Sequence, residues 1–252
     1  MTSRVTRRDW LQVVAAGAVT GVLGASSSAE ARGQCPTFAG DPADILPSQA
    51  DSPQVILQKL LAGNARYVDN DPIPHNRDVD QGLEVDPVNG QRPAAMVLTC
   101  ADSRVVPELI FDQPRARLFV CRVAGNFATD EIIGSLEYGV RVLGAKMLVV
   151  MGHSACGAVT STITLITQGP GAFPPDILAS KIPTVLAGLR APVERALAQS
   201  PPGTPDSELL RRATDEVARD NADRLRNLPP ILQGLLVVPA RYDFDTGVAT
   251  LL

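Results

Sequence analysis

Residues 95–104 read AMVLTCADSR, an uninterrupted apolar run that ends at a cysteine and is followed by polar residues. Residues 147–157 read MLVVMGHSACG and repeat this arrangement, with an apolar run at 147–151 that leads into a histidine and then a cysteine. Apolar runs without alternating polar positions are typical of strands that are covered on both faces of a parallel sheet. The two stretches therefore predict two buried strands with metal-binding residue types at their carboxyl ends.

Further elements follow outward from these two stretches. Apolar runs at 118–123 and 235–238 predict two more strands, and the turn Asp245-Thr246-Gly247 leads into a short last strand at 248–252. Helices are expected at 53–68 after the cap Ser52-Pro53, at 129–143 between Thr129 and Gly144, at 156–167, at 177–198, and at 206–227 with Asp206 or Ser207 as cap. Strands that alternate with helices predict an α/β fold. We expect a central, mostly parallel four-stranded sheet with a short fifth strand and helices on both faces.

The composition limits the class of protein. The chain has 252 residues, 45% of them hydrophobic and 20% charged, with a formal net charge of −4. This composition is typical of a soluble globular protein, and the length allows one sizeable core or two small ones. The net charge is negative, so no basic surface for nucleic acid is predicted.

The first 31 residues resemble a twin-arginine (Tat) signal peptide. Arg7 and Arg8 precede an apolar run at 13–25, and the small-residue triplet Ala29-Glu30-Ala31 ends the segment. We expect cleavage near Ala31 after passage through the Tat export machinery, which makes the mature protein periplasmic or secreted. An uncleaved membrane anchor is the alternative, but the apolar run is short for a bilayer. The mature domain then spans 32–252, with an extended arm at about 32–52.

The strand ends predict a metal site. Ligands gather beyond the carboxyl ends of the strands in an open parallel sheet, so Cys100, His153 and Cys156 can converge there. Two thiolates and an imidazole suit zinc, with a fourth position for water or a carboxylate. The alternative is two buried structural cysteines and a buried histidine with ordinary hydrogen bonds. The matching motifs at two strand ends favour zinc.

These motifs resemble those of the β-class carbonic anhydrases over nearly the whole mature chain. The first signature, Cys-x-Asp-x-Arg, is present as Cys100, Asp102 and Arg104, and the second, His-x-x-Cys, as His153 and Cys156. Supporting matches are Asn64-Ala65-Arg66-Tyr67, Pro107-Glu108, Phe111-Asp112, Leu118-Phe119-Val120, Ala124-Gly125-Asn126, Glu137-Tyr138 and Asp245-Thr246-Gly247. The sequence departs from the family at Arg115-Ala116-Arg117, where members usually carry Gly-Asp.

The resemblance implies a lyase that interconverts carbon dioxide and bicarbonate, with one Zn²⁺ per subunit and zinc-bound hydroxide as the nucleophile. It also implies a homodimer or homotetramer with active sites at the subunit interface. Two thiolates make zinc a weaker Lewis acid than three histidines do. Activity is therefore expected to rise with pH through mildly alkaline values, above the ~7 of three-histidine zinc.

The resemblance also assigns roles to individual residues. Asp102, paired with Arg104, accepts a hydrogen bond from the zinc-bound hydroxide; released from Arg104, it becomes a fourth zinc ligand in a closed state. Gln91 is expected to donate a hydrogen bond to bicarbonate across the dimer interface. The remaining substrate-binding positions are Phe119, Ala124, Gly125 and Tyr138, although core packing is an equal reading for the two aromatic residues.

Two other functions remain open from the sequence. Carbonyl sulfide and carbon disulfide hydrolases share this fold and these ligands, and a noncatalytic zinc-binding protein is the second alternative. Of the remaining candidate side chains, His75 is expected on the surface and Cys121 in the core. Cys35 is either free or paired between chains.

Overall fold

The computed structural model describes residues 45–73, 91–228 and 230–252. The chain divides into two units, 1–37 and 38–252, and every described residue belongs to the second. The expected signal peptide, most of the expected arm, Cys35 and His75 lie outside the described residues. Among the helices described, none combines the length and the apolar character needed to cross a bilayer.

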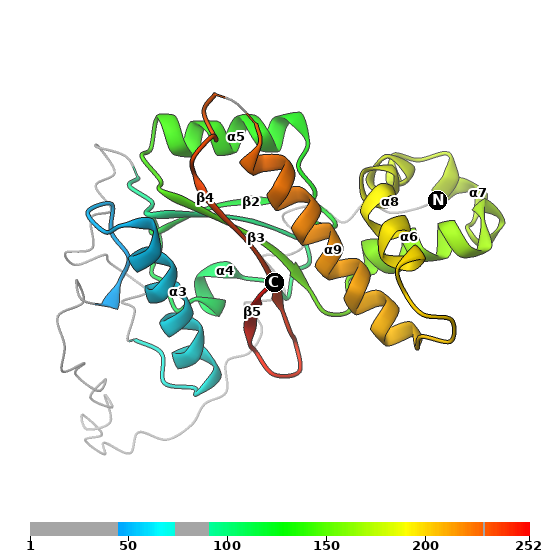
Figure 1. The fold of residues 1–252 in the computed structure, drawn as a ribbon, viewed down its shortest axis with the longest axis horizontal. Helices are drawn as coiled ribbons and strands as arrows, with labels where there is room; N and C mark the ends of the chain where they lie inside the picture. Colours follow the sequence, from blue (N-terminus) through cyan, green and yellow to red (C-terminus); the bar gives the residue numbers. More distant parts are fainter. Residues whose placement is uncertain (1–44, 74–90, 229) are drawn as a thin grey trace, which may run out of the picture. The chain divides into compact units, whose positions relative to one another are not determined.

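A five-stranded sheet forms the centre of the fold, in the order β2-β1-β3-β4-β5 (Figure 1). Its strands are β1 (Ala95–Thr99), β2 (Leu118–Arg122), β3 (Met147–His153), β4 (Leu236–Tyr242) and β5 (Ala249–Leu251). The first four are parallel and β5 is antiparallel to β4. The predicted fold class is confirmed. Two strands run further than expected, because β3 and β4 stay paired as far as His153 and Tyr242.

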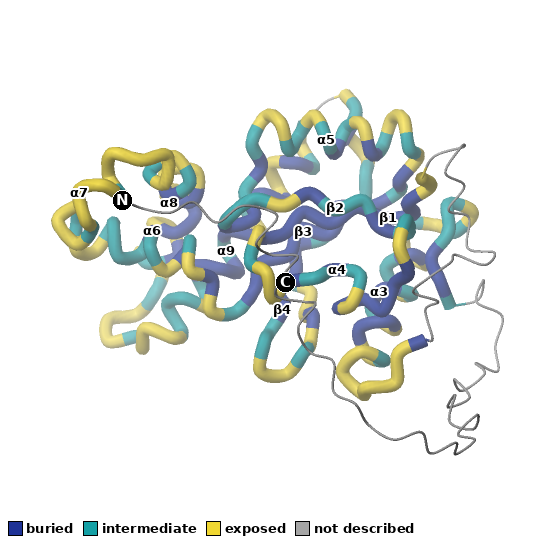
Figure 2. Tube along the Cα trace, turned by 180° about the vertical axis from the view of Figure 1, so that it is seen from behind, coloured by how far each residue is buried: buried dark blue, intermediate teal, exposed yellow. Residues whose placement is uncertain are grey.

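Helices cover both faces of the sheet, as the uninterrupted apolar strands require (Figure 2). Successive β1 residues point to opposite faces. Val97 packs in one cluster with α3 (Pro53–Val68) and α4 (Pro107–Ile110), and Met96 and Leu98 pack in another with α5 (Asp130–Arg141) and α9 (Asp206–Arg226). All three side chains are fully buried, so β1 is the centre of the core.

The expected helix starts are formed by side-chain caps. The Ser52 hydroxyl, just before Pro53, accepts a hydrogen bond from the backbone N–H of Val55. The Thr129 hydroxyl accepts a hydrogen bond from the backbone N–H of Ile132. The prediction for the end of α5 was too long: the helix ends at Arg141 and the turn at Gly144 follows it. The short helix α4 was not predicted, since a single turn has no periodicity to detect.

Three helices pack against one another: α6 (Gly157–Gln168), α8 (Ile182–Ala198) and α9. The segment between α6 and α8 holds a short 3-10 helix (Pro170–Ala172) and α7 (Pro175–Leu178). The single helix predicted at 177–198 is wrong, because α7 and α8 are separate. Ser180 lies between them, and its hydroxyl accepts a hydrogen bond from the backbone N–H of Ile182, the first residue of α8. The predicted side-chain cap of α9 is also wrong, since its N-cap is Pro205.

Candidate metal centre

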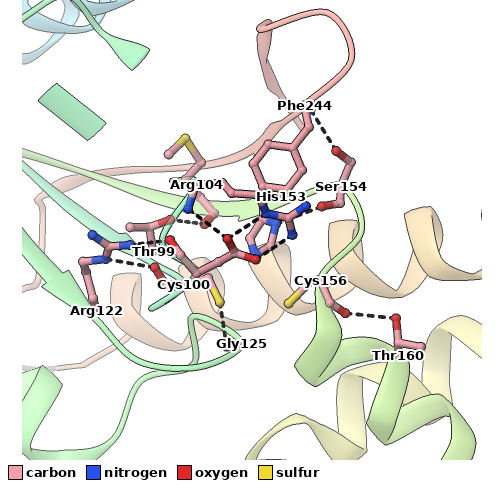
Figure 3. A network of polar contacts seen from close by, with 12 residues as sticks. Thr99, Cys100, Arg104, Arg122, Gly125, His153, Ser154, Cys156, Thr160 and Phe244 are labelled. Carbon is pink, nitrogen blue, oxygen red and sulfur yellow. Dashed lines mark hydrogen bonds and ion pairs between the residues drawn. The ribbon is translucent and has the colours of Figure 1, made fainter. Parts of the chain in front are cut away.

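Three side chains of metal-ligand type meet at the carboxyl edge of the sheet. Cys100 directly follows β1, His153 is the last residue of β3, and Cys156 is the N-cap of α6. The two strands are parallel neighbours with Thr99 opposite Met151, so their ends lie side by side. The ligand atoms of the three residues all lie within 4.8 Å of one another (Figure 3). The structure thus brings together the ligand set that the sequence predicts.

The imidazole of His153 is oriented for a metal by its neighbour in sequence. Its Nδ1 lies 2.9 Å from the carbonyl oxygen of Ser154. A carbonyl oxygen only accepts, so Nδ1 carries the hydrogen and Nε2 of the neutral ring offers a lone pair. This Nε2 is buried and has no hydrogen-bond partner among the described residues. A buried nitrogen without a partner is costly, and a cation between it and the two sulfurs would satisfy it.

The two thiols form a coupled pair. A hydrogen bond from the Cys156 thiol, with help from the backbone amide of Gly125, lowers the pKa of Cys100 to about 4. The same contact, together with burial, raises the pKa of Cys156. The contact therefore makes one thiol of the pair easier to ionise than the other. Soft sulfur donors beside an imidazole fit Zn²⁺, which needs both cysteines deprotonated.

The loop after β2 also contributes to the site. The backbone N–H of Gly125 donates a hydrogen bond to the sulfur of Cys100 at 3.3 Å. Gly125 has a φ of +83°, and an added Cβ would lie 2.5 Å from Cδ1 of Leu189 on α8. A side chain here is therefore disfavoured by backbone conformation and by the space that Leu189 occupies. The structure shows the Gly125 amide donating to the sulfur of a candidate ligand; the sequence predicted Gly125 only as a substrate-binding position.

Asp102 and Arg104 form a two-pronged ion pair beside the three ligands. Nε of Arg104 lies 2.9 Å from Oδ1 of Asp102 and Nη2 lies 2.7 Å from Oδ2. The Arg104 amide also donates to Oδ1. These hydrogen bonds, those of the guanidinium first, hold the pKa of Asp102 well below its usual range. Oδ2 is 4.0 Å from Nε2 of His153, so an ionised carboxylate faces the metal position.

Arg122, at the end of β2, fixes the backbone that carries Cys100 and Asp102. Its Nε donates to the Cys100 carbonyl oxygen at 3.0 Å, and its Nη2 donates to the Asp102 carbonyl oxygen at 2.6 Å. This role was missed in the sequence. The signal for it is an arginine that closes an otherwise apolar strand run.

Helix α9 anchors the loop that carries Gly125. The buried side-chain oxygen of Asn221 accepts a hydrogen bond from the backbone N–H of Ala128 at 2.8 Å. Arg224 donates a hydrogen bond to the Ala128 carbonyl oxygen at 2.6 Å. Both polar backbone groups of one loop residue are thus held by one helix. Nothing in the sequence pairs these positions, which lie 93 and 96 residues apart.

The predicted substrate-binding residues are spread more widely. Gln91 is exposed and precedes β1, so it lies at the opposite end of that strand from Cys100. Phe119 packs against the cluster on the α5 face, and Tyr138 on α5 is 50% exposed. Ala124 is half-buried and adjoins Gly125. Of the predicted substrate-binding residues, Gly125 contacts the candidate ligand Cys100, and Ala124 precedes Gly125 in the chain. Cys121 is buried in the core, as predicted, and burial raises its pKa to about 11.

Comparison with known proteins identifies the family. The family model for carbonic anhydrase matches residues 95–249, which is more than half of the chain and holds all three ligand positions. The chain belongs to the carbonic anhydrase family. "Carbonic anhydrase 2" of Mycobacterium tuberculosis is 38% identical over 206 residues, which cover 79% of this carbonic anhydrase and 93% of the relative. The carbonic anhydrase of Mycolicibacterium smegmatis is 36% identical over 146 residues, 57% of this chain and 70% of the relative.

Solved structures place this carbonic anhydrase in the β class by fold. A tetrameric β-carbonic anhydrase from Sordaria macrospora superposes with a TM-score of 0.57 at 23% identity, covering 66% of this chain and 83% of that one. The Coccomyxa β-carbonic anhydrase superposes with a TM-score of 0.56 at 21% identity, covering 78% and 81%. At these identities the likeness shows the fold, and the enzyme class comes from the family and its curated members.

Proposed function

We propose that this carbonic anhydrase binds one zinc ion per subunit through Cys100, His153 and Cys156 and uses it for the reversible hydration of carbon dioxide to bicarbonate. One observation carries the proposal: the three ligand atoms lie within 4.8 Å of one another, and the buried Nε2 of His153 has no hydrogen-bond partner in the described part of the chain. The bound zinc supplies the Lewis acidity that makes water nucleophilic at neutral to alkaline pH. The enzyme class excludes the noncatalytic zinc protein as an alternative.

Asp102 orients the attacking water in this proposal. Because Arg104 occupies both carboxylate oxygens and keeps the group ionised, Asp102 can accept a hydrogen bond and cannot donate one. This favours the arrangement in which the fourth metal position is open to water. Rotation of Asp102 away from Arg104 would give the closed arrangement, with the carboxylate as fourth ligand.

Substrate binding is proposed to involve two subunits. Ala124 and Gly125 flank the metal ligands, and Phe119 and Tyr138 are proposed to line the apolar part of the pocket. Gln91 lies a full strand away from Cys100 in its own subunit. We therefore assign the hydrogen bond to bicarbonate to Gln91 of a neighbouring subunit.

A homodimer or homotetramer is proposed on this basis. The Sordaria macrospora enzymes are described as tetrameric. Three large apolar side chains, Leu109, Tyr138 and Val142, are at least half exposed in the single subunit and suit burial against another copy. Light scattering coupled to size-exclusion chromatography measures the molar mass in solution. A monomer at micromolar concentration would contradict the proposal.

Export by the Tat pathway, to the periplasm or beyond, is proposed from the sequence alone. Replacement of Arg7 and Arg8 by lysine is expected to retain the protein inside the cell with its N-terminus intact. Mass spectrometry of the exported protein should find a new N-terminus near residue 32. Export of the Lys-Lys variant at the normal level would exclude this route.

The function is tested by zinc content and stopped-flow carbon dioxide hydration, measured on the same sample from neutral to alkaline pH. One zinc per subunit and a rate that rises with pH are expected. Cys100→Ser should lose both properties, whereas Cys121→Ser, a buried cysteine outside the site, should keep both. Hydration at the buffer rate in zinc-loaded protein, with hydrolysis of carbonyl sulfide, would assign the site to the other substrate class.

A further inference from the structure

Phe244, in the turn between β4 and β5, contacts two residues of the site at once. The Cζ atom of Arg104 lies 4.0 Å from the centroid of the Phe244 ring, in a cation–π contact. The same ring lies 5.1 Å from the ring of His153, centroid to centroid, at an interplanar angle of 55° (Figure 3). One half-buried aromatic ring thus touches both the proposed metal ligand and the partner of Asp102.

The position of Phe244 is itself fixed by Ser154. The hydroxyl of Ser154 accepts the amide of Phe244 at 2.9 Å, and the amide of Ser154 donates to the carbonyl oxygen of Tyr242 at 2.9 Å. The Tyr242 ring meets the Phe244 ring edge to face, with centroids 5.4 Å apart. The residue whose carbonyl orients His153 therefore also holds Phe244 in place.

The contact has a clear physical effect on Arg104. Its side chain is 54% exposed, and an exposed ion pair contributes little by itself, because water and side-chain entropy compete with it. The guanidinium uses its edge for the two carboxylate oxygens of Asp102, which leaves its flat face free to stack. The Phe244 ring occupies that face and restrains the arginine where the ion pair alone would not.

We propose that Phe244 is a positioning residue, which holds Arg104 on Asp102 and thereby keeps the carboxylate in place beside the metal position. The effect on turnover rests on the proposed function; the restraint on Arg104 does not. Phe244→Leu removes the aromatic face and keeps an apolar side chain. Phe244→Tyr keeps the ring and should restore whatever the leucine variant loses. Phe173→Leu, in the turn before α7, is the matched control for loss of a phenylalanine elsewhere.

The first measurement follows Arg104 directly, without reference to catalysis. Zinc-loaded variants are treated with phenylglyoxal, and modified arginines are quantified by mass spectrometry. Arg190 is the internal reference, because its side chain is 53% exposed and also paired with a carboxylate, that of Glu194. In Phe244→Leu the modification of Arg104 relative to Arg190 should rise about threefold, the scale of an exposed cation–π contact. Phe244→Tyr and Phe173→Leu should match the wild type.

The second measurement is stopped-flow hydration. Phe244→Leu should lower kcat about threefold with full zinc content, Phe244→Tyr should recover it, and Ser154→Ala should fall between them. An unchanged Arg104 ratio and an unchanged kcat in Phe244→Leu would overturn the proposal. A higher Arg104 ratio with wild-type kcat would also overturn it, since Phe244 would then hold the arginine without positioning anything for the reaction. Wild-type protein without hydration activity would sink the proposed function, and the Arg104 ratio would still report on the restraint.

Discussion

The backbone N–H of Gly125 points at the sulfur of Cys100, 3.3 Å away, although the two residues are 25 positions apart in the chain. The hydrogen bond stabilises the thiolate form of the cysteine, which is the form that binds metal. The loop after β2 is therefore part of the proposed metal site as well as a connection between β2 and α5. The five predictions below concern this loop, the ion pair beside the proposed metal position, which gives two of them, the helix that anchors the loop, and the thiols.

Gly125→Ala is expected to weaken both the fold and the metal site. The new Cβ would lie 2.5 Å from Leu189, and alanine disfavours a φ of +83°, so stability should fall by about 2 kcal/mol or more. Zinc transfer to a chelator should become faster, because the amide leaves the sulfur. Gly144→Ala is the matched control, since that glycine has a φ of +79° but lies in the turn after α5. Equal rates of zinc loss from the two variants would show that the Gly125 amide does not stabilise metal binding.

Asp102→Asn is expected to lower turnover about tenfold or more while zinc stays bound. The pKa of Asp102 lies well below its ordinary 3.8 because Arg104 pairs with it, so the carboxylate is ionised throughout the working range. The ratio of wild-type to variant rate should therefore stay constant from about pH 6 to about pH 9. Glu194→Gln, which removes the exposed pair with Arg190, should leave the rate unchanged. Full turnover in zinc-loaded Asp102→Asn would remove this residue from the mechanism.

The same ion pair gives a stability prediction with a definite sign. A carboxyl group whose pKa is lower in the folded state stabilises the fold at pH values above the unfolded pKa. That contribution is lost as the pH falls through the lower, folded value. In urea titrations the wild type should exceed Asp102→Asn in stability at neutral pH. The gap should close only below about pH 4, where Asp102 begins to protonate in the unfolded chain. If the stability difference closed near neutral pH instead, a group other than Asp102 would be responsible for it.

Asn221→Ala should loosen the loop from its anchor on α9. The substitution leaves the buried amide of Ala128 without an acceptor, at an expected cost of about 1–3 kcal/mol. Zinc should also be lost faster to a chelator, because the anchored loop carries the Gly125 amide. Asn227→Ala, an exposed asparagine just after the same helix, should change neither property. A fall in Tm with an unchanged rate of zinc loss would show that the Asn221 hydrogen bond stabilises the fold but does not support metal binding.

Removal of zinc should expose one reactive thiolate. With a pKa of about 4, Cys100 should be alkylated by iodoacetamide in chelator-treated protein at a rate nearly independent of pH above neutrality. Cys121, with a pKa raised to about 11 by burial, should react slowly and faster only as the pH rises. Peptide mapping distinguishes the two cysteines, and zinc-loaded protein should protect Cys100. Equal rates for both thiols after chelation would contradict the assignment of the thiolate.

The sheet and most helices were predictable because their signals are local. An uninterrupted apolar run such as 95–99 needs cover on both faces, and a cap such as Ser52 before Pro53 starts a helix whatever lies around it. Predictions failed where neighbouring segments decide the outcome. The division of 177–198 into α7 and α8 is one such case, and the extension of β3 to His153 by pairing with β4 is another.

The sequence by itself determined the donor set, since cysteine and histidine at the ends of two apolar runs specify both the chemistry and the edge of the sheet. Only the tertiary structure decided how those donors are oriented. Four contacts show this. One settles an orientation: the Ser154 carbonyl oxygen accepts from the ring of His153. The other three join segments far apart in the chain: the Gly125 amide with the Cys100 sulfur, the Asn221 side chain with the Ala128 amide, and the Phe244 ring with Arg104. The physical reason is that a hydrogen bond or ring contact depends on separation in space to within a few tenths of an ångström, and residue order fixes that separation only after the chain has folded.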